Sequence, residues 1–359
     1  MSRFFSNKYK NLTPYTPGEQ PRQMQYIKLN TNESPFPPTA TAQAKAASAA
    51  ENLQLYSDPE CRELVQKAAK HFGVEEDEIL FTNGSDEILN FAFMAFCDET
   101  HPAVFPDITY GFYSVFAELN GVPHATIPLN KDFTVNINDY IGVNKTVFLA
   151  NPNAPTGIAL SVADIEKIVA SNPENIVVID EAYVDFGAES VVPLIHKYDN
   201  LLVTQTFSKS RSMAGARLGF GIGCKEIISD LNTIKYSTNP YNVNRMTMAA
   251  GVGTLEDEKE VRENCRRIME NRDFTTSELL KLGFALTDSR TNFVFAKHDF
   301  VSGKEIYSRL KERGVLVRHF DTPALTDYNR ITIGSREQMH VLIDTLKVIL
   351  EDKDENGNN

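Results

Sequence analysis

The sequence predicts an α/β protein with a large domain on a mostly parallel central sheet and a smaller α/β domain at the C-terminal end. Short apolar runs alternate with helical segments from about residue 40 to 235, as parallel strands joined by crossover helices do. The 359 residues are too many for one small core, and about two domains are expected at this length.

Composition excludes several classes of protein. A net charge of −12 argues against a nucleic-acid surface, which needs concentrated Lys and Arg. The chain has four cysteines, Cys61, Cys97, Cys224 and Cys265. They lie far apart and form no CxxC pair, so they indicate neither a disulfide framework nor a zinc site. No metal is expected. The start lacks a signal-peptide apolar region and no run approaches a membrane span, which favours a cytoplasmic protein.

Residues 1–38 are rich in Pro, Asn and Thr, which predicts an extended arm rather than a helix. Composition alone favours a packing strap or a disordered tail. Tyr15 and Asn32 are the residues with which such an arm can close over a cleft.

The large domain is expected over residues 39–252. Its predicted helices are 40–51, 62–72, a segment beginning at 85, and 162–170; its predicted strands are 79–82, 147–150, 176–179, 201–204 and 218–223. Residues 103–129 are expected to form two strands around a helix that holds Tyr110, Phe112 and Tyr113. The run at 176–179 is β-branched throughout, which is typical of a buried parallel strand.

The small domain is expected over residues 253–350, followed by a polar tail, 351–359, that is expected to be disordered. A long charged helix, 255–282, suits a connection between the domains. Further strands are expected at 293–297, 315–320 and 330–334, and further helices at 303–313 and 336–350.

One loop combines groups that suit covalent chemistry. Lys209 lies between serines, and Arg217 follows eight residues later across a run of small residues. Desolvation lowers an amine's pKa toward its nucleophilic form, and an arginine grips a phosphate with two parallel hydrogen bonds. An amine beside a phosphate cradle is what pyridoxal phosphate requires, although a lone lysine is more often an ordinary surface residue.

Two other stretches suit the same ligand. Gly84 and Ser85 begin a predicted helix, where free backbone N–H groups bind phosphate, although a simple N-cap fits equally. Asp180 ends the buried run at 176–179, at the edge of an open α/β sheet where ligands bind.

The motifs NGSDE, NPNAPTG, DEAY and SKSRSMAGARLG follow one another in a consistent order. With them the chain resembles the fold-type I pyridoxal phosphate aminotransferases. Within these it is similar to the histidinol-phosphate aminotransferase branch, also through PYTPG, LNTNE, YSDP, VLVR and RITIG. The resemblance covers the chain from Tyr15 to about Leu350.

The resemblance implies roles for individual residues. Lys209 would bind the cofactor as a Schiff base and transfer protons, Asp180 would lie under the pyridine nitrogen, Tyr183 would reach the 3′-oxygen, and Tyr110 would stack on the ring. The phosphate would be held by Gly84, Ser85, Asp86, Thr206, Ser208 and Arg217. Tyr56 would reach the phosphate in the neighbouring subunit, which implies a homodimer.

The chain departs from the family at Ala154, where an asparagine usually contacts the 3′-oxygen; Asn153 is the nearest amide that can replace it. Substrate binding is expected from Tyr15, Asn32, Arg318 and Arg330, with the arginines taking the substrate phosphate and the carboxylates.

The expected reaction is transamination between L-histidinol phosphate and 2-oxoglutarate. The alternatives are threonine-phosphate decarboxylase, a broad aromatic aminotransferase, and a non-catalytic binding protein. The last is disfavoured because Lys209 and Asp180 are both present.

Overall fold

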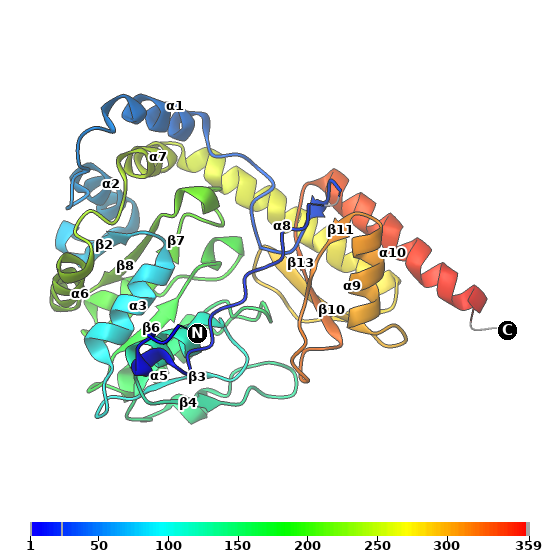
Figure 1. The fold of residues 1–359 in the computed structure, drawn as a ribbon, viewed down its shortest axis with the longest axis horizontal. Helices are drawn as coiled ribbons and strands as arrows, with labels where there is room; N and C mark the ends of the chain where they lie inside the picture. The colour runs from blue at the N-terminus through cyan, green and yellow to red at the C-terminus, as the bar shows by residue number, and fades with distance from the viewer. Residues whose placement is uncertain (1, 23, 357–359) are drawn as a thin grey trace.

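The computed structural model describes residues 2–22 and 24–356, and its largest element is a seven-stranded sheet (Figure 1). The strands are β2 (Ile79–Thr82), β3 (Ala103–Pro106), β4 (His124–Ile127), β5 (Thr146–Ala150), β6 (Val177–Asp180), β7 (Leu201–Thr206) and β8 (Gly219–Gly223). Their order is β2-β8-β7-β6-β5-β3-β4, and within this sheet β8 runs antiparallel to both of its neighbours. The predicted mostly parallel α/β sheet is confirmed.

Helices cover both faces of this sheet because its strands are apolar on both sides. Val177 and Ile179 of β6 pack into one core cluster and Val178 into another. The helices on the Val178 face are α3 (Ser85–Phe96), α4 (Phe112–Asn120) and α6 (Lys225–Thr238); those on the opposite face are α2 (Arg62–Phe72), α5 (Val162–Ser171) and α7 (Arg245–Glu256). Helix α1 (Ala40–Ala49) packs against α7. Such two-sided burial is typical of parallel sheets.

The C-terminal part contains a four-stranded antiparallel sheet in the order β12-β13-β10-β9. Its strands are β9 (Phe284–Leu286), β10 (Phe293–His298), β12 (Arg318–His319) and β13 (Tyr328–Thr332), and its helices are α8 (Glu258–Lys281), α9 (Gly303–Glu312) and α10 (Arg336–Asn356). Helix α8 extends from the end of α7 to this sheet (Figure 1). The single helix predicted at 255–282 is wrong at its start, because α7 continues through the expected domain boundary at 252 and the helices change at Asp257.

The N-terminal arm is tied to the C-terminal part. Strand β1 (Ile27–Lys28) pairs in parallel with β11 (Val315–Leu316). The strand predicted at 315–320 is therefore divided: β11 pairs with the arm, whereas β12 pairs with β13. Before β1 the arm forms one short 3₁₀ helix, Asn7–Tyr9.

The tail departs from its prediction. Helix α10 continues through Asn356, whereas disorder was expected from residue 351. Asp352 explains the extension, because it pairs with Arg309 at 2.9 Å and Arg313 at 3.1 Å, near the end of α9. Residues 357–359 of the predicted tail lie outside the described residues.

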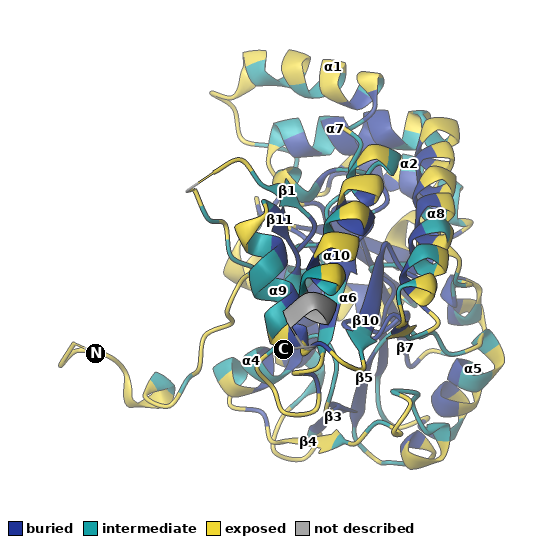
Figure 2. Cartoon of the chain, turned by 90° about the vertical axis from the view of Figure 1, so that its right-hand side faces the viewer, coloured by how far each residue is buried: buried dark blue, intermediate teal, exposed yellow. Residues whose placement is uncertain are grey.

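The strands of the large sheet are largely buried except for the edge strand β4, whereas the outer faces of α1 and α10 are exposed (Figure 2). Of the helices in the described ranges, none combines the length and apolar character needed to span a bilayer.

Candidate active site

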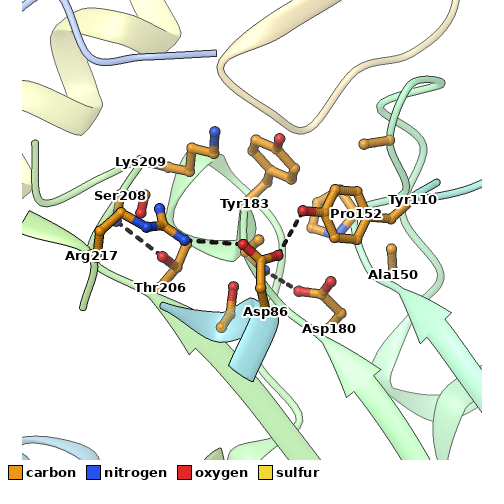
Figure 3. A pocket seen from close by; sticks show the side chains of 13 residues that line it. Asp86, Tyr110, Ala150, Pro152, Asp180, Tyr183, Thr206, Ser208, Lys209 and Arg217 are labelled. Carbon is orange, nitrogen blue, oxygen red and sulfur yellow. Dashed lines mark hydrogen bonds and ion pairs between the residues drawn. The ribbon is translucent and has the colours of Figure 1, made fainter. Parts of the chain in front are cut away.

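One edge of the seven-stranded sheet gathers most of the residues singled out in the sequence. The carboxyl ends of β5, β6 and β7 meet there, and the start of the antiparallel β8 lies at the same edge. They enclose a cavity of about 110 Å³ lined by Ser85, Asp86, Tyr110, Ala150, Pro152, Ala154, Asp180, Ala182, Tyr183, Thr206, Ser208, Lys209 and Arg217 (Figure 3). The fold thus brings together nine of the predicted site residues.

Asp180 is a buried carboxylate at the bottom of this cavity. Its oxygens accept hydrogen bonds from Tyr113 Oη at 3.1 Å and from the backbone N–H of Ala182 at 3.1 Å. Burial raises the pKa of Asp180 to about 6, against the lowering effect of these two donors. No described cation forms an ion pair with Asp180, so a ligand with a protonated ring nitrogen would supply the charge that it lacks.

The helix start at the opposite wall is shaped for an anion. Gly84 has a φ of +83°, and a Cβ there would lie 2.4 Å from Arg217 Nη2. A side chain would therefore displace the arginine from the first turn of α3. A Cβ on Gly219 would lie 2.2 Å from the backbone nitrogen of Ser85, so β8 also packs against this turn without room for a side chain.

Asp86 occupies the centre of the view in Figure 3, between a cation and a phenol. Its carboxylate lies 3.0 Å from Arg217 Nη2 and accepts a hydrogen bond from Tyr110 Oη at 2.7 Å. Thr206 and Ser208 line the wall beside Arg217. Hydroxyls, a guanidinium and a helix N-terminus are groups that suit a phosphate, and Asp86 orients Arg217 and Tyr110 beside them.

Lys209 and Tyr183 lie together at the mouth of the cavity (Figure 3). Lys209 Nζ is 5.6 Å from the centre of the Tyr183 ring and donates a hydrogen bond to Thr31 O at 3.3 Å. Tyr183 Oη accepts from Asn32 Nδ2 at 2.9 Å. The amine thus has a neutral carbonyl partner instead of a carboxylate, which leaves it available for reaction with a ligand.

A second cavity continues from this mouth toward the C-terminal sheet, and Tyr15, Asn32, Lys209, Arg318 and Arg330 all line it. Arg318 and Arg330 are directly opposite each other across β12 and β13. Within the described ranges neither arginine forms an ion pair; Arg330 Nη2 donates to Asn30 O at 3.1 Å. Burial, assisted by the charge of Arg318, lowers the pKa of Arg330.

The arm closes one side of this second cavity. Tyr15 stacks on Phe112 at the start of α4, with ring centres 4.3 Å apart. The two terminal nitrogens of Arg318 each lie 3.5 Å from an arm carbonyl, those of Thr16 and Pro17. The arm thus places the Tyr15 phenol in the same cavity as the paired arginines.

Asn153 does not take the position expected of it. It is absent from the lining of the first cavity, which at this point exposes Pro152 and Ala154. Its Nδ2 hydrogens are donated to Ile108 O and Thr156 Oγ1, and its Oδ1 accepts from Thr109. The amide joins its own turn to the loop at Ile108 and Thr109, so it is not available to replace the asparagine missing at position 154.

Tyr56 lies outside both cavities of this chain. Its side chain is 80% exposed and stacks on Tyr241 with ring centres 4.6 Å apart. Leu53 and Leu55 nearby in the sequence are also exposed, so the structure gathers large apolar side chains at the position predicted to reach a neighbouring subunit.

Two contributors to the site carry no signal in the sequence. Tyr113 lies among the apolar residues of an amphipathic helix, where an aromatic residue is usually only core. Its burial raises the pKa of the phenol well above its ordinary value, which keeps it a donor to Asp180. Thr31 contributes through its backbone carbonyl, and a pattern of side chains in the sequence does not indicate a backbone contact.

The donor set fits the pyridoxal phosphate expected from the sequence. A helix start that suits an anion lines one cavity together with a carboxylate and an amine, neither of which forms an ion pair with any described residue. These are the groups that a phosphate, a pyridinium nitrogen and an aldehyde require.

Comparison with known proteins agrees with this site. The family described as aminotransferase class I and II matches residues 24–346. The histidinol-phosphate aminotransferase of Brachyspira hyodysenteriae is 45% identical over 98% of this chain and 100% of its own length. Histidinol-phosphate aminotransferase 1 of Bradyrhizobium diazoefficiens is 47% identical, again over 98% and 100% of the two chains.

Solved structures share the fold. The histidinol-phosphate aminotransferase of Sinorhizobium meliloti, crystallised in complex with pyridoxal-5′-phosphate, superposes with a TM-score of 0.84 at 23% identity, covering 91% of this chain and 92% of its own. The Clostridium acetobutylicum histidinol-phosphate aminotransferase gives 0.82 at 23%, covering 90% and 99%. The chain belongs to the class I and II aminotransferase family.

Proposed function

We propose that this protein is a pyridoxal phosphate-dependent aminotransferase that acts on L-histidinol phosphate and 2-oxoglutarate, giving imidazole acetol phosphate and glutamate in histidine biosynthesis. The observation that carries the proposal is the pair Arg318 and Arg330, directly opposite each other without acidic partners, in a cavity that also contains Lys209. The names of the relatives described above support the same substrate.

The cationic pair selects for an anion of more than one charge. Like charges directly opposite each other in a sheet repel, and this cost is offset when a ligand neutralises both. A phosphate monoester carries nearly two negative charges and three terminal oxygens, and Tyr15, which lines the same cavity, could add a hydroxyl as a further donor. A phosphorylated amine therefore suits this end of the cleft better than a plain aromatic amino acid.

The chain's own groups have separate tasks in the reaction. The bound cofactor supplies an aldehyde for attachment to an amine and a pyridinium ring that withdraws electrons. Lys209 Nζ provides that amine and then holds and moves a proton at the substrate α-carbon. Asp180, fixed by Tyr113, would keep the pyridine nitrogen of that cofactor protonated. Arg217, Thr206 and Ser208 would hold the phosphate of the cofactor near the start of α3.

The test is an assay of the purified holoenzyme with L-histidinol phosphate and 2-oxoglutarate. We expect stoichiometric glutamate, with a kcat/KM about 100-fold above that for phenylalanine or tyrosine, roughly 2.7 kcal/mol. Carbon dioxide release from a phosphorylated amino acid, without glutamate, would support the decarboxylase instead. Equal use of phenylalanine would support a broad aromatic aminotransferase.

We also propose that the active unit is a homodimer. Support comes from Tyr56, which is 80% exposed and stacked on a second exposed ring, an arrangement that is costly in water and favourable at an interface. Tyr56 would then bind the phosphate of the partner's cofactor. Sedimentation of a stable and fully active monomer would contradict this, and Tyr56→Phe should weaken cofactor binding without dissociating the dimer.

A further inference from the structure

Segment 30–32 contacts three side chains of the site with three successive residues. The carbonyl of its first residue accepts from Arg330, the carbonyl of its second accepts from Lys209, and the side chain of its third donates to Tyr183. The first two are backbone contacts that any residue could make. The third depends on the asparagine side chain, so Asn32 is the position at which the sequence of this segment acts on the site.

Asn32 is held in one orientation by β13. It is 1% exposed and has a φ of +56°, in the left-handed region that asparagine tolerates better than most residues. Its backbone N–H donates to Thr332 Oγ1 at 3.0 Å, and the same hydroxyl donates to Asn32 Oδ1 at 3.1 Å. Because the oxygen of the amide faces Thr332, its nitrogen faces Tyr183.

The direction of this hydrogen bond determines where the phenol can donate. Tyr183 Oη accepts from Asn32 at 2.9 Å, so its own hydrogen must point elsewhere. No described residue accepts it, and Tyr183 lines the cavity beside Lys209. Across the cavity, Pro152 and Ala154 offer no side-chain donor, which leaves the Tyr183 hydroxyl with little competition for a ligand oxygen there.

We propose that Asn32 is a positioning residue that turns the Tyr183 hydroxyl hydrogen into the cavity, toward the ring oxygen of the bound cofactor. This assigns Asn32 a role different from the substrate contact that the sequence predicted. It rests on the proposed cofactor and on the proposed role of Tyr183, but not on the identity of the substrate.

The readout is the pH midpoint of the visible absorption of the bound cofactor, measured without substrate. A donor to the ring oxygen stabilises its anionic form and therefore lowers this midpoint. Asn32→Gly removes the amide, keeps the left-handed backbone and adds no charge, so we expect the midpoint to rise by about one unit. Asn32→Asp keeps the bond to Thr332 but replaces the donor by an acceptor, and it should raise the midpoint further.

A double-mutant cycle separates positioning from a general structural effect. Tyr183→Phe should raise the midpoint at least as much as Asn32→Gly, and adding Asn32→Gly to Tyr183→Phe should change nothing more. Asn30→Ala is the matched control, because the amide of Asn30 donates to the arm carbonyl of Glu19 and not to Tyr183; its midpoint should equal that of the wild type. Thermal unfolding shows whether each variant is folded. If Asn32→Gly does not fold, Thr332→Val replaces it, because this substitution removes the hydroxyl that orients the Asn32 amide.

Two results would overturn the inference. If Tyr183→Phe shifts the midpoint but neither Asn32→Gly nor Thr332→Val does, Asn32 does not act on the phenol, while the role of Tyr183 stands. If Tyr183→Phe itself leaves the midpoint unchanged, the proposed role of Tyr183 falls and the inference falls with it. If the enzyme does not use histidinol phosphate, all of these midpoints should be unchanged, because they are measured without substrate.

Discussion

The two ends of the cleft differ in how their charges are balanced. At the end formed by the seven-stranded sheet, Asp86 pairs with Arg217, and Asp180 accepts from Tyr113 and a backbone N–H. At the other end Arg318 and Arg330 face each other without an acidic partner among the described residues. The sheet end is organised by the chain alone, whereas the two arginines at the other end form no ion pair with a described residue, and a bound anion would neutralise their charge.

The largest effect should come from the reactive amine of the organised end. Lys209→Ala should fold and bind cofactor, since Arg217 and Asp180 remain, but kcat should fall by about five orders of magnitude, ~7 kcal/mol in the barrier. Borohydride reduction of the wild type followed by peptide mapping should place the cofactor on Lys209. Recovery of the label on another lysine would contradict the assignment.

Asp180→Asn tests whether the buried carboxylate takes part in catalysis or has a structural role only. The amide can still accept from Tyr113 but cannot balance a protonated ring nitrogen, so kcat should fall by on the order of 4 kcal/mol, about a thousandfold. Tyr113→Phe should have a smaller effect in the same direction, because it removes one hydrogen bond and leaves the charge. Near-normal turnover by Asp180→Asn would make the carboxylate structural only.

The arginine end should respond in KM more than in kcat. Arg318→Ala should raise the KM for histidinol phosphate by about 100-fold, roughly 2.7 kcal/mol, and change the KM for an aromatic amino acid much less. Arg313→Ala, which removes an arginine paired with Asp352 on α10, is the matched control and should leave both values unchanged. Equal increases in KM for the two substrates would contradict the assignment of Arg318 to the substrate phosphate.

The smallest expected effect concerns the stability of the protein without cofactor. Burial raises the pKa of Asp180 to about 6 and that of its neighbour Glu181 to about 7. The folded state therefore binds protons more tightly than the unfolded chain, and this stabilisation is lost as the pH rises from about 4 to 7. The free energy of unfolding should fall over that range by on the order of 3 kcal/mol per carboxyl.

Urea unfolding at several pH values measures this fall, and the variant that combines Asp180→Asn with Glu181→Gln should flatten it. Cofactor should remove the Asp180 part alone, since Glu181 accepts instead from Ser190, Gln205 and a backbone N–H. A fall of equal size in the double variant would show that other groups cause it.

The same contrast explains what could be predicted from the sequence. The organised end is built from strand ends and helix starts, and these carry local signals: the strand predicted at 79–82 and the helix predicted at 62–72 have the bounds found in the structure. These local signals therefore place Lys209, Asp180 and Arg217 at one sheet edge.

Contacts between distant segments could not be predicted in this way. The division of 315–320 into β11 and β12 depends on pairing with β1, almost 290 residues earlier. The local sequence VLVR does not indicate this pairing. Asn153 was expected at the ring because it is adjacent to Ala154, but hydrogen bonds to Ile108, Thr109 and Thr156 hold it away. Tyr113 was missed because a buried phenol and a core aromatic look the same in a helical pattern.

The pairing of β1 with β11 also constrains how the chain is made. During synthesis residues 27–28 emerge long before residues 315–316, and Asn32 emerges long before Thr332, which orients it. The ribosome can release all strands of the seven-stranded sheet by residue 223 while the arm still lacks its partner. Contacts so distant in sequence form late, so the enzyme acquires its fold before its active site, and a nascent chain cannot consume substrate until translation is nearly complete.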